Sequence, residues 1–406
     1  MATARIGRPR IALLYAACTL MVVALPPASG QAPPNPDLTA QAPQPDVDGL
    51  IAESLSYLLR TQNADGSWGT HRSKRPAEVM AAIPGSHEAF RVATSALCFK
   101  AVCDATARRT EARSAETQHV IERGLDYLIR NAPVKRASAI EHYNVWSFGF
   151  GLEALAEFLI AHPTHTRGDE IRATCRELVR KLALYQTLDG GWGYYSFNDV
   201  PTFRPSDTSM SFTTATILVG LDRARKAGIE IAPKVLEQAV SHVERSRTPA
   251  GSFLYGEYLK YVPRHGVNQI KGSACRTPAC QYSLRLFERG RPVAEETSAL
   301  EDLWIRHARF QQIGVRRPIP HESWYAISGY FYLYGQAYGA RLLRECPPDV
   351  QARLWPRLIE AVTFCRQPDG SYWDYPLYDY HSAYGTAFAL IALACVPITE
   401  APSRDE

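Results

Sequence analysis

Residues 185–195 read YQTLDGGWGYY, in which a glutamine and an Asp-Gly-Gly turn are followed at once by a tryptophan. Two other stretches carry nearly the same pattern: RTQNADGSWGT at residues 60–70 and CRQPDGSYWDY at residues 365–375. Asp-Gly supplies the positive φ at which helices commonly end. The tryptophan beside it buries a large ring whose N–H needs an acceptor. The pattern therefore predicts a structural staple at the end of a helix.

The three turns are spaced like members of one repeat. Asp65, Asp189 and Asp369 are 124 and 180 residues apart, close to two and three units of about 60 residues. Degenerate copies stand at the intervening positions: LDYLIRNAP (125–133), HVERSRTPAGSF (242–253) and IRHARFQQIG (305–314). The chain is therefore predicted to contain six repeat units.

Each unit has two different halves. The first is amphipathic, with Leu50, Ile51, Leu55, Leu58 and Leu59 recurring at helical spacing in the first unit. The second is nearly free of charge, as in residues 91–103, 143–155, 207–221, 323–340 and 381–396. A helix with one apolar stripe lies at a surface, whereas one that is apolar all round is buried. The pattern predicts an all-α fold, an (α/α)6 toroid of six hairpins, because an open solenoid would leave the inner helices uncovered.

The repeat motif then acquires a structural role. Gln186 is expected to bond free carbonyl or N–H groups at the end of the outer helix. Trp192 is expected to wedge between neighbouring outer helices, with its N–H directed at a carbonyl.

The two ends of the chain read differently from the repeats. Residues 1–30 have the basic start, short apolar run and small residues of a secretory signal, with a retained anchor as the alternative. Residues 31–48 form a Pro/Ala/Gln-rich leader, residues 49–398 the toroid, and residues 399–406 a disordered tail. We expect a secreted or periplasmic protein without a transmembrane segment once the signal is removed.

Charge and cysteine content narrow the function further. The net charge of +4 includes three arginines of the signal, and basic residues form no stripe, so nucleic acid is not an expected partner. An exported chain can keep disulfides, and Cys275 and Cys280 are close enough in sequence to close a small loop. The other cysteines after Cys18 lie in apolar or helical stretches, where buried free thiols are expected.

The motif resembles the QW repeat of the squalene and oxidosqualene cyclases and the related repeats of protein prenyltransferase β subunits. The matches are QNADGSW (62–68), QTLDGGW (186–192) and QPDGSYW (367–373), and the similarity extends from about Gly49 to Pro397. The resemblance implies an α/α toroid. It does not imply an activity, because function resides in the site.

Cyclases that protonate squalene resemble one another in an Asp-x-Asp-Asp-Thr-Ala stretch. The nearest match here is PSDTSMS (205–211), which retains Asp207 before Thr208 but lacks the flanking acids. Asp207 is therefore either a catalytic acid or the N-cap of an inner helix.

Protein prenyltransferases hold zinc with an Asp-x-Cys pair and a histidine. His381 in YDYHSAYGTAFAL matches that histidine, and Glu322 the aspartate, but Trp324 stands where the cysteine would be. The resemblance leaves open a zinc ion held by Glu322 and His381, with His321 as a third ligand, although no cofactor is expected.

Acids also precede several inner segments. Glu322, Asp379 and His381 can meet at one mouth of the toroid, where paired carboxylates would serve a polysaccharide hydrolase or lyase. Helix N-termini favour acids in any case, so a structural explanation covers the same residues.

The inner segments are rich in aromatic residues. Candidate cavity residues are Trp146, Phe212, Trp324, Tyr325 and Tyr384, which would guide a polyprenyl chain, stabilise a cation or stack on sugars, unless they are ordinary core. We expect an exported toroid that lacks the established cyclase and zinc prenyltransferase chemistry. Its central cavity would bind an apolar, isoprenoid or glycan-like ligand, or a protein partner. The alternatives are a cyclase-like enzyme using Asp207 and a polysaccharide-active enzyme, and the sequence leaves open whether any reaction occurs.

Overall fold

The computed structural model describes residues 46–73, 83–108, 113–138, 141–195, 209–313 and 321–398. They belong to one compact unit, which runs from Pro45 to Glu406. The predicted signal and tail, the leader apart from residues 46–48, and Asp207 lie outside the described residues.

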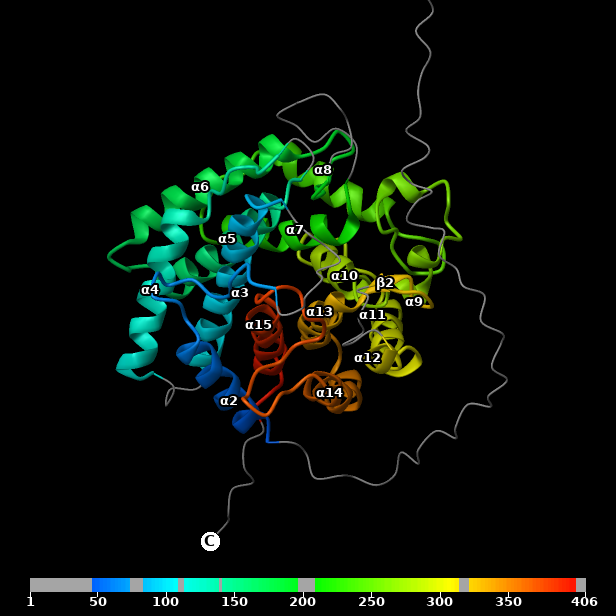
Figure 1. The fold of residues 1–406 in the computed structure, drawn as a ribbon. Helices are drawn as coiled ribbons and strands as arrows, with labels where there is room; N and C mark the ends of the chain where they lie inside the picture. Colours follow the sequence, from blue (N-terminus) through cyan, green and yellow to red (C-terminus); the bar gives the residue numbers. More distant parts are fainter. Residues whose placement is uncertain are drawn as a thin grey trace, which may run out of the picture. The chain divides into compact units, whose positions relative to one another are not determined.

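Outer and inner helices alternate along the chain, which confirms the predicted all-α toroid (Figure 1). The outer helices of the described ranges are α2 (Val47–Arg60), α4 (Ala115–Asn131), α6 (Gly168–Tyr185), α8 (Pro233–Arg245), α11 (Val293–Glu301) and α14 (Pro348–Thr363). The inner helices are α3 (Ser86–Arg108), α5 (Asn144–Ala161), α7 (Ser211–Lys226), α10 (Thr277–Arg285), α13 (Tyr332–Arg344) and α15 (His381–Ala394).

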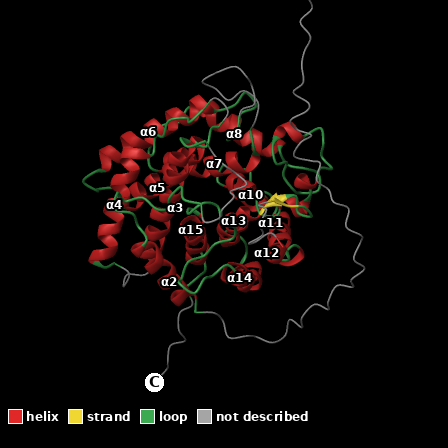
Figure 2. Ribbon diagram, viewed as in Figure 1, coloured by secondary structure: helices red, strands yellow, loops and turns green. Residues whose placement is uncertain are grey.

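Shorter elements interrupt the later units. They are η2 (Glu257–Leu259), η3 (Gly266–Asn268), α9 (Ile270–Ser273), the π-helical turn η4 (Asp302–Arg306), α12 (Phe310–Ile313) and η5 (Gly329–Phe331). A small antiparallel hairpin joins β1 (His321–Glu322) to β2 (Ile327–Ser328), drawn in yellow in Figure 2.

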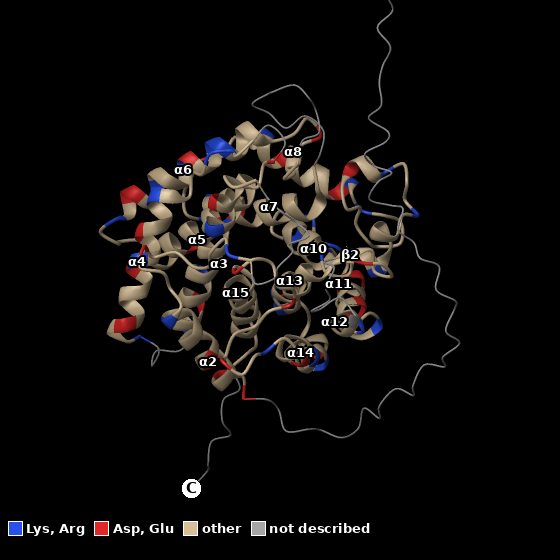
Figure 3. Ribbon diagram, viewed as in Figure 1, with Lys and Arg blue, Asp and Glu red and all other residues tan. Residues whose placement is uncertain are grey.

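The inner helices form a closed ring. Each packs against the next inner helix along the chain, and α15 packs against α3, so the last unit meets the first (Figure 1). The outer helices pack against this ring, with α4 on α3, α6 on α5, α8 on α7 and α14 on α13. Charged residues concentrate on the outer helices (Figure 3). Closure covers the apolar inner helices on all sides, as the sequence pattern requires.

One hydrogen bond recurs after the turns and defines the register of the repeat. The backbone N–H of a buried aromatic residue donates to a serine or threonine hydroxyl in the following helical segment. The pairs are Trp68 with Ser95 (2.9 Å), Trp192 with Thr214 (3.0 Å), Phe253 with Ser273 (3.1 Å) and Tyr372 with Thr386 (2.9 Å). The register corrects the sequence comparison in the last unit, where Tyr372 and not Trp373 occupies the wedge position.

The predicted staple is present in the third unit. Gly190 has a φ of +94°, and Gln186 donates through Nε2 to the carbonyls of Gly190 (2.8 Å) and Val235 (2.9 Å). Because Val235 lies in the first turn of α8, the glutamine ties one outer helix to the next. The first unit repeats this arrangement, with Gln62 donating to Val120 of α4.

Two inner segments depart from the sequence prediction. The segment 323–340, expected to be one helical stretch, contains the turn and second strand of the β1–β2 hairpin and then η5 before α13 begins at Tyr332. Ala326 at the hairpin turn has a φ of +53°, a conformation that a helix excludes. In the third unit α7 begins at Ser211 with Met210 as its N-cap, whereas Asp207 lies outside the described residues.

Two further findings concern the described part of the chain. None of its helices is long and apolar enough to cross a bilayer. Cys275 and Cys280 are both buried free thiols, so the small disulfide loop considered from the sequence does not form. Cys280 lies inside α10, where the backbone N–H bonds to Arg276.

Candidate functional site

A cavity of about 440 Å³ opens between the N-terminal parts of the inner helices. Thirteen of its 17 lining residues are aromatic, and none of the described lining residues is charged. The aromatic residues are Phe90, Tyr143, Trp146, Phe150, Tyr194, Tyr195, Tyr330, Phe331, Tyr334, Tyr378, Tyr380, Tyr384 and Phe388; the others are Ala93, Thr94, Leu97 and Leu377. Such a wall favours an uncharged and largely apolar occupant.

Helical spacing produces this wall. Tyr380, Tyr384 and Phe388 follow one another at intervals of four residues at the start of α15, and Phe90 and Leu97 are two turns apart on α3. Residues three or four apart lie on one face of a helix, so the first turns of α3, α5, α13 and α15 each present an aromatic or apolar face to the cavity.

Several tyrosine hydroxyls in the wall already have hydrogen-bond partners. The hydroxyl of Tyr143 bonds that of Tyr195, and the hydroxyl of Tyr194 bonds that of Tyr255. Burial raises the pKa of Tyr194 well above its usual value. These phenols are therefore neutral at physiological pH, and the pairs offer few unsatisfied groups to a polar ligand.

Asp374 is an acid at the repeat position that holds the wall residue Tyr194 in the third unit. It follows the wedge residue Tyr372 by two places, as Tyr194 follows Trp192. Its side chain is completely buried. It accepts hydrogen bonds from the backbone N–H groups of Leu333 (2.9 Å) and Tyr375 (2.7 Å) and from the hydroxyl of Tyr384 (3.4 Å).

No cationic side chain of the described residues contacts the carboxyl of Asp374. Burial raises the pKa of Asp374 to about 7, and the backbone hydrogen bonds only partly offset this effect. Tyr384 lines the cavity, so the carboxyl is connected to the cavity through one phenol. A buried carboxyl that titrates near neutrality can both donate and accept a proton.

An ionic network lies beyond the cavity, toward the C-terminal ends of the inner helices. The hydroxyl of Tyr338 donates to Thr216 (3.2 Å), one turn from the cavity residue Tyr334. Further along the helices are the ion pairs Lys100 with Asp104 (3.0 Å), Lys100 with Glu157, Arg223 with Glu157 (2.9 Å) and Arg341 with Glu153 (2.8 Å). These pairs join α3, α5, α7 and α13 and give the toroid a polar layer at that end.

The predicted cavity residues fall into three groups. Trp146 and Tyr384 line the cavity. Phe212 is completely buried one layer behind it, with its ring 6.0 Å from that of Trp146 and 4.9 Å from that of Phe331. The structure thus places Phe212 in the packing that supports the wall.

Trp324 and Tyr325 do not line the cavity, because they belong to the β1–β2 hairpin and not to an inner helix. Trp324 is 63% exposed, and the ammonium group of Lys271 lies 3.5 Å from its ring centre. Tyr325 is buried against Phe310, with ring centroids 5.0 Å apart. Their assignment to the cavity is therefore wrong.

The side chains predicted at the mouth have separate hydrogen-bond partners. Glu322 accepts the backbone N–H of Tyr325 (2.6 Å), Asp379 accepts the hydroxyl of Thr70 (3.2 Å), and Nδ1 of His381 lies 2.7 Å from the carbonyl oxygen of Tyr378. None of these three side chains lines the cavity. Their catalytic role, the zinc site at Glu322 and His381, and the acid role of Asp207 stay predictions.

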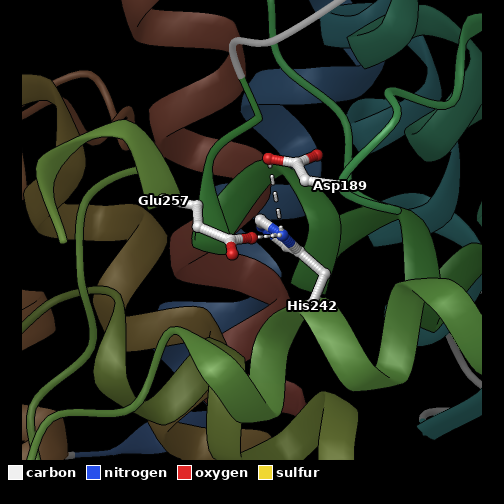
Figure 4. A group of neighbouring side chains, drawn as sticks. All are labelled: Asp189, His242 and Glu257. Atoms are coloured by element: carbon white, nitrogen blue, oxygen red, sulfur yellow. Dashed lines mark hydrogen bonds and ion pairs between the residues drawn. The ribbon is translucent and has the colours of Figure 1, made fainter.

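A separate cluster joins the third and fourth units (Figure 4). Nδ1 of His242 lies 3.1 Å from Glu257 Oε2 and 4.0 Å from Asp189 Oδ2. Among the described residues, these three side chains are the group of potential metal ligands whose nitrogen and oxygen atoms all lie within 4.8 Å of one another. Asp189 was assigned only a turn role from the sequence, and His242 and Glu257 were not predicted to meet.

No family model matches the chain. It is 28% identical over 204 residues to drimenyl diphosphate synthase from Streptantibioticus cattleyicolor, a match that covers 50% of this chain and 32% of the relative. The matching part is thus about a third of that relative's length.

Solved structures extend the likeness to the fold. An alpha-1,6-mannanase, GH76A of Salegentibacter sp., superimposes with a TM-score of 0.53 at 9% identity, over 87% of this chain and all of that chain. A possible GH105 family member from Klebsiella pneumoniae gives 0.51 at 13% identity, over 90% of this chain and 95% of that chain. These solved structures show that the chain shares their α/α-toroid fold.

Proposed function

We propose that the protein binds an uncharged, isoprenoid-type ligand in its central cavity. The observation that carries this proposal is the wall itself, in which 13 of 17 residues are aromatic. The cavity volume of about 440 Å³ lies within the range of small-molecule pockets, roughly 300 to 1,000 Å³. Burial of a hydrocarbon chain against such a wall is favourable in proportion to the apolar area removed from water.

A glycan fits the same wall less well. Glycosidases use two carboxyl groups on either side of the scissile bond, and no carboxylate is among the described lining residues. Sugar hydroxyls need hydrogen-bond partners when they leave water, whereas the phenols of Tyr143 and Tyr195 already bond each other. The apolar ligand is therefore the better supported of the two.

A second function, proton-initiated rearrangement of that ligand, is favoured by the contact between Asp374 and Tyr384. With Asp374 protonated, its O–H would donate to the phenol oxygen of Tyr384, and the phenol O–H would turn toward the cavity. The O–H bond of Tyr384 would then break as a C–H bond forms at a ligand double bond, while the proton of Asp374 passes to the phenol oxygen. The aromatic wall would stabilise the resulting carbocation. Loss of a proton to the Asp374 carboxylate, again through Tyr384, would complete an isomerisation or cyclisation that needs no cofactor.

Binding is tested by fluorescence titration with geranylgeraniol and, in parallel, with α-1,6-mannotriose. Ala93 lines the cavity, so Ala93→Trp places an indole inside it. Ala52 is exposed on α2, so Ala52→Trp is the matched control. We expect saturable binding of geranylgeraniol to the natural protein and to Ala52→Trp, and its loss in Ala93→Trp. Saturable mannotriose binding that is lost in Ala93→Trp would overturn the choice of ligand.

Catalysis is tested separately with Asp374→Asn. If the acid initiates a reaction, this variant retains geranylgeraniol binding but no longer converts the ligand to an isomer detected by gas chromatography. Unchanged conversion by Asp374→Asn would contradict the catalytic role and leave the binding proposal intact.

A further inference from the structure

We propose that Asp189, His242 and Glu257 form a binding site for one divalent metal ion of the Zn²⁺ type, independent of the central cavity. The three residues come from separate segments: the Asp-Gly turn of the third unit, the last turn of α8, and η2 (Figure 4). One ring nitrogen and two carboxylate oxygens lie within 4.8 Å of one another. Imidazole and carboxylate groups are ordinary zinc ligands.

The distances suit a common central ion. Zinc binds nitrogen and oxygen ligands at about 2.0 to 2.2 Å, so neighbouring ligand atoms of a tetrahedral site are about 3.3 to 3.6 Å apart. The separations of 3.1 Å (His242 to Glu257) and 4.0 Å (His242 to Asp189) bracket that range. Small rotations of the two carboxylates would therefore close the set around an ion.

The ring of His242 is fixed in the required orientation. Its side chain is completely buried, and a Cβ added to Gly191 would lie 2.8 Å from Nε2. Nε2 thus packs against the backbone of the Asp-Gly-Gly turn and has no hydrogen-bond partner. Nδ1 therefore faces the two carboxylates and hydrogen-bonds Glu257; a metal ion would replace the Nδ1 proton, and the neutral imidazole would then carry its proton on Nε2.

The cluster does not have the geometry of a serine triad. Ser209 donates to Asp189 and lies 3.5 Å from Nδ1 of His242. Glu257 approaches the same ring nitrogen. A triad needs the nucleophile and the carboxylate on opposite nitrogens of the imidazole, so convergence on one nitrogen favours a ligand set over a catalytic base. Ser209 is positioned as a further oxygen donor.

A nearby arginine competes with the ion. Nη2 of Arg245 lies 3.3 Å from Glu257 Oε2 and donates to the backbone carbonyl of Asp189 (2.6 Å). Its side chain is 48% exposed, so it can move into solvent when a cation takes its place. Removing the guanidinium should therefore strengthen metal binding, whereas removing a ligand should weaken it. This opposite response distinguishes a metal site from a simple ion-pair network.

The site would fasten an irregular segment to the toroid. Glu257 belongs to η2, and the preceding Tyr255 bonds through its hydroxyl to Tyr194 in the cavity wall. An ion that joins Glu257 to α8 and to the turn at Asp189 would stabilise this side of the cavity. The role we infer is structural.

Zinc binding to tag-free protein is measured by calorimetry, with metal content of the dialysed sample as a second readout. We expect the natural protein to bind one equivalent of zinc. Glu257→Gln should weaken binding by more than about tenfold, because loss of a direct ligand should exceed the effect of an outer-shell change. Arg245→Gln should strengthen binding. Glu244→Gln is the matched control. Glu244 is on α8, as His242 is, and its nearest cationic partner is Arg289, at 3.9 Å.

The proposal is overturned if the natural protein shows no saturable zinc binding, or if Glu257→Gln binds as tightly as Glu244→Gln. Circular dichroism establishes that each variant is folded before titration. The side chain of His242 is completely buried, whereas that of Glu257 is 14% exposed. Glu257 is therefore the safer ligand to change. This test does not measure geranylgeraniol binding, so the cavity proposal and the metal-site proposal can be refuted independently.

Discussion

The phenol of Tyr384 donates to the buried carboxyl of Asp374 across 3.4 Å. This hydrogen bond connects the buried acid to the aromatic cavity. The closest contacts of Asp374 are backbone N–H groups, and no positive side chain of the described chain neutralises it. This arrangement keeps a proton available in an otherwise apolar pocket.

The burial of Asp374 should make stability depend on pH. Its pKa is about 7 in the folded protein against 3.8 in the unfolded chain, so between these values the folded state binds more protons. The free energy of unfolding should fall by roughly 4 kcal/mol as pH rises from about 4 to 7. Asp374→Asn should lose this component when urea unfolding is followed across that range.

The control for this measurement is Asp169→Asn, since Asp169 is fully exposed at the start of α6. We expect that variant to keep the slope of the natural protein. An unaltered slope in Asp374→Asn would show that the buried carboxyl does not titrate near neutrality.

Trp192 should be worth far more to stability than Trp324. Trp192 is completely buried, and its indole N–H donates to the carbonyl of Leu182 at 2.8 Å. We expect Trp192→Ala to lower the free energy of unfolding by about 3 to 5 kcal/mol. Trp324→Ala, which removes an exposed ring and one cation–π contact, should cost about 1 kcal/mol or less. Similar losses in denaturant unfolding would refute the staple role.

Two turn glycines allow backbone strain to be separated from steric clash. Gly190 and Gly251 both have positive φ, +94° and +88°. A Cβ at Gly190 would lie 2.5 Å from the carbonyl oxygen of Gln238, whereas a Cβ at Gly251 meets nothing within 4 Å. Gly251→Ala should cost about 1 to 2 kcal/mol from strain alone, and Gly190→Ala distinctly more. Equal losses on thermal unfolding would mean that contact with α8 contributes nothing.

Lys100 should be essential to the polar layer beyond the cavity. Its buried ammonium group contacts Asp104 and Glu157, so Lys100→Met leaves Asp104 without this cation and Glu157 with Arg223 alone. The expected loss is about 3 to 5 kcal/mol. Arg172→Met, which removes an exposed pair with Asp169, should cost about 1 kcal/mol or less. If urea unfolding gives comparable losses, the layer is not held by these ion pairs.

The sequence predicted the fold well because the repeat is carried by local chemistry. The Asp-Gly turn, the wedge tryptophan and the alternation of amphipathic with apolar segments are all visible within one unit. Trp146 and Tyr384 were expected in the cavity because they lie on uninterrupted inner helices. Trp324 and Tyr325 were misplaced because the hairpin at residues 321–328 resembles an apolar helical stretch in composition.

The residues of the candidate sites were harder to predict, because they come together only when the helices of different units pack into the closed ring. The special position of Asp374 appears only after the wedge residues of different units are aligned, with Tyr372 in place of the neighbouring tryptophan. Asp189, His242 and Glu257 are brought together by packing between two units and by η2, an element that interrupts the repeat. No spacing along the chain indicates such a contact.

The central claim is most directly tested by native mass spectrometry of residues 31–406, purified gently from the expressing cells. The account predicts a co-purifying uncharged lipid or isoprenoid mass that is present in Ala52→Trp and absent in Ala93→Trp. A ligand mass that persists in Ala93→Trp, or an oligosaccharide mass that this variant loses, would contradict an isoprenoid-binding central cavity.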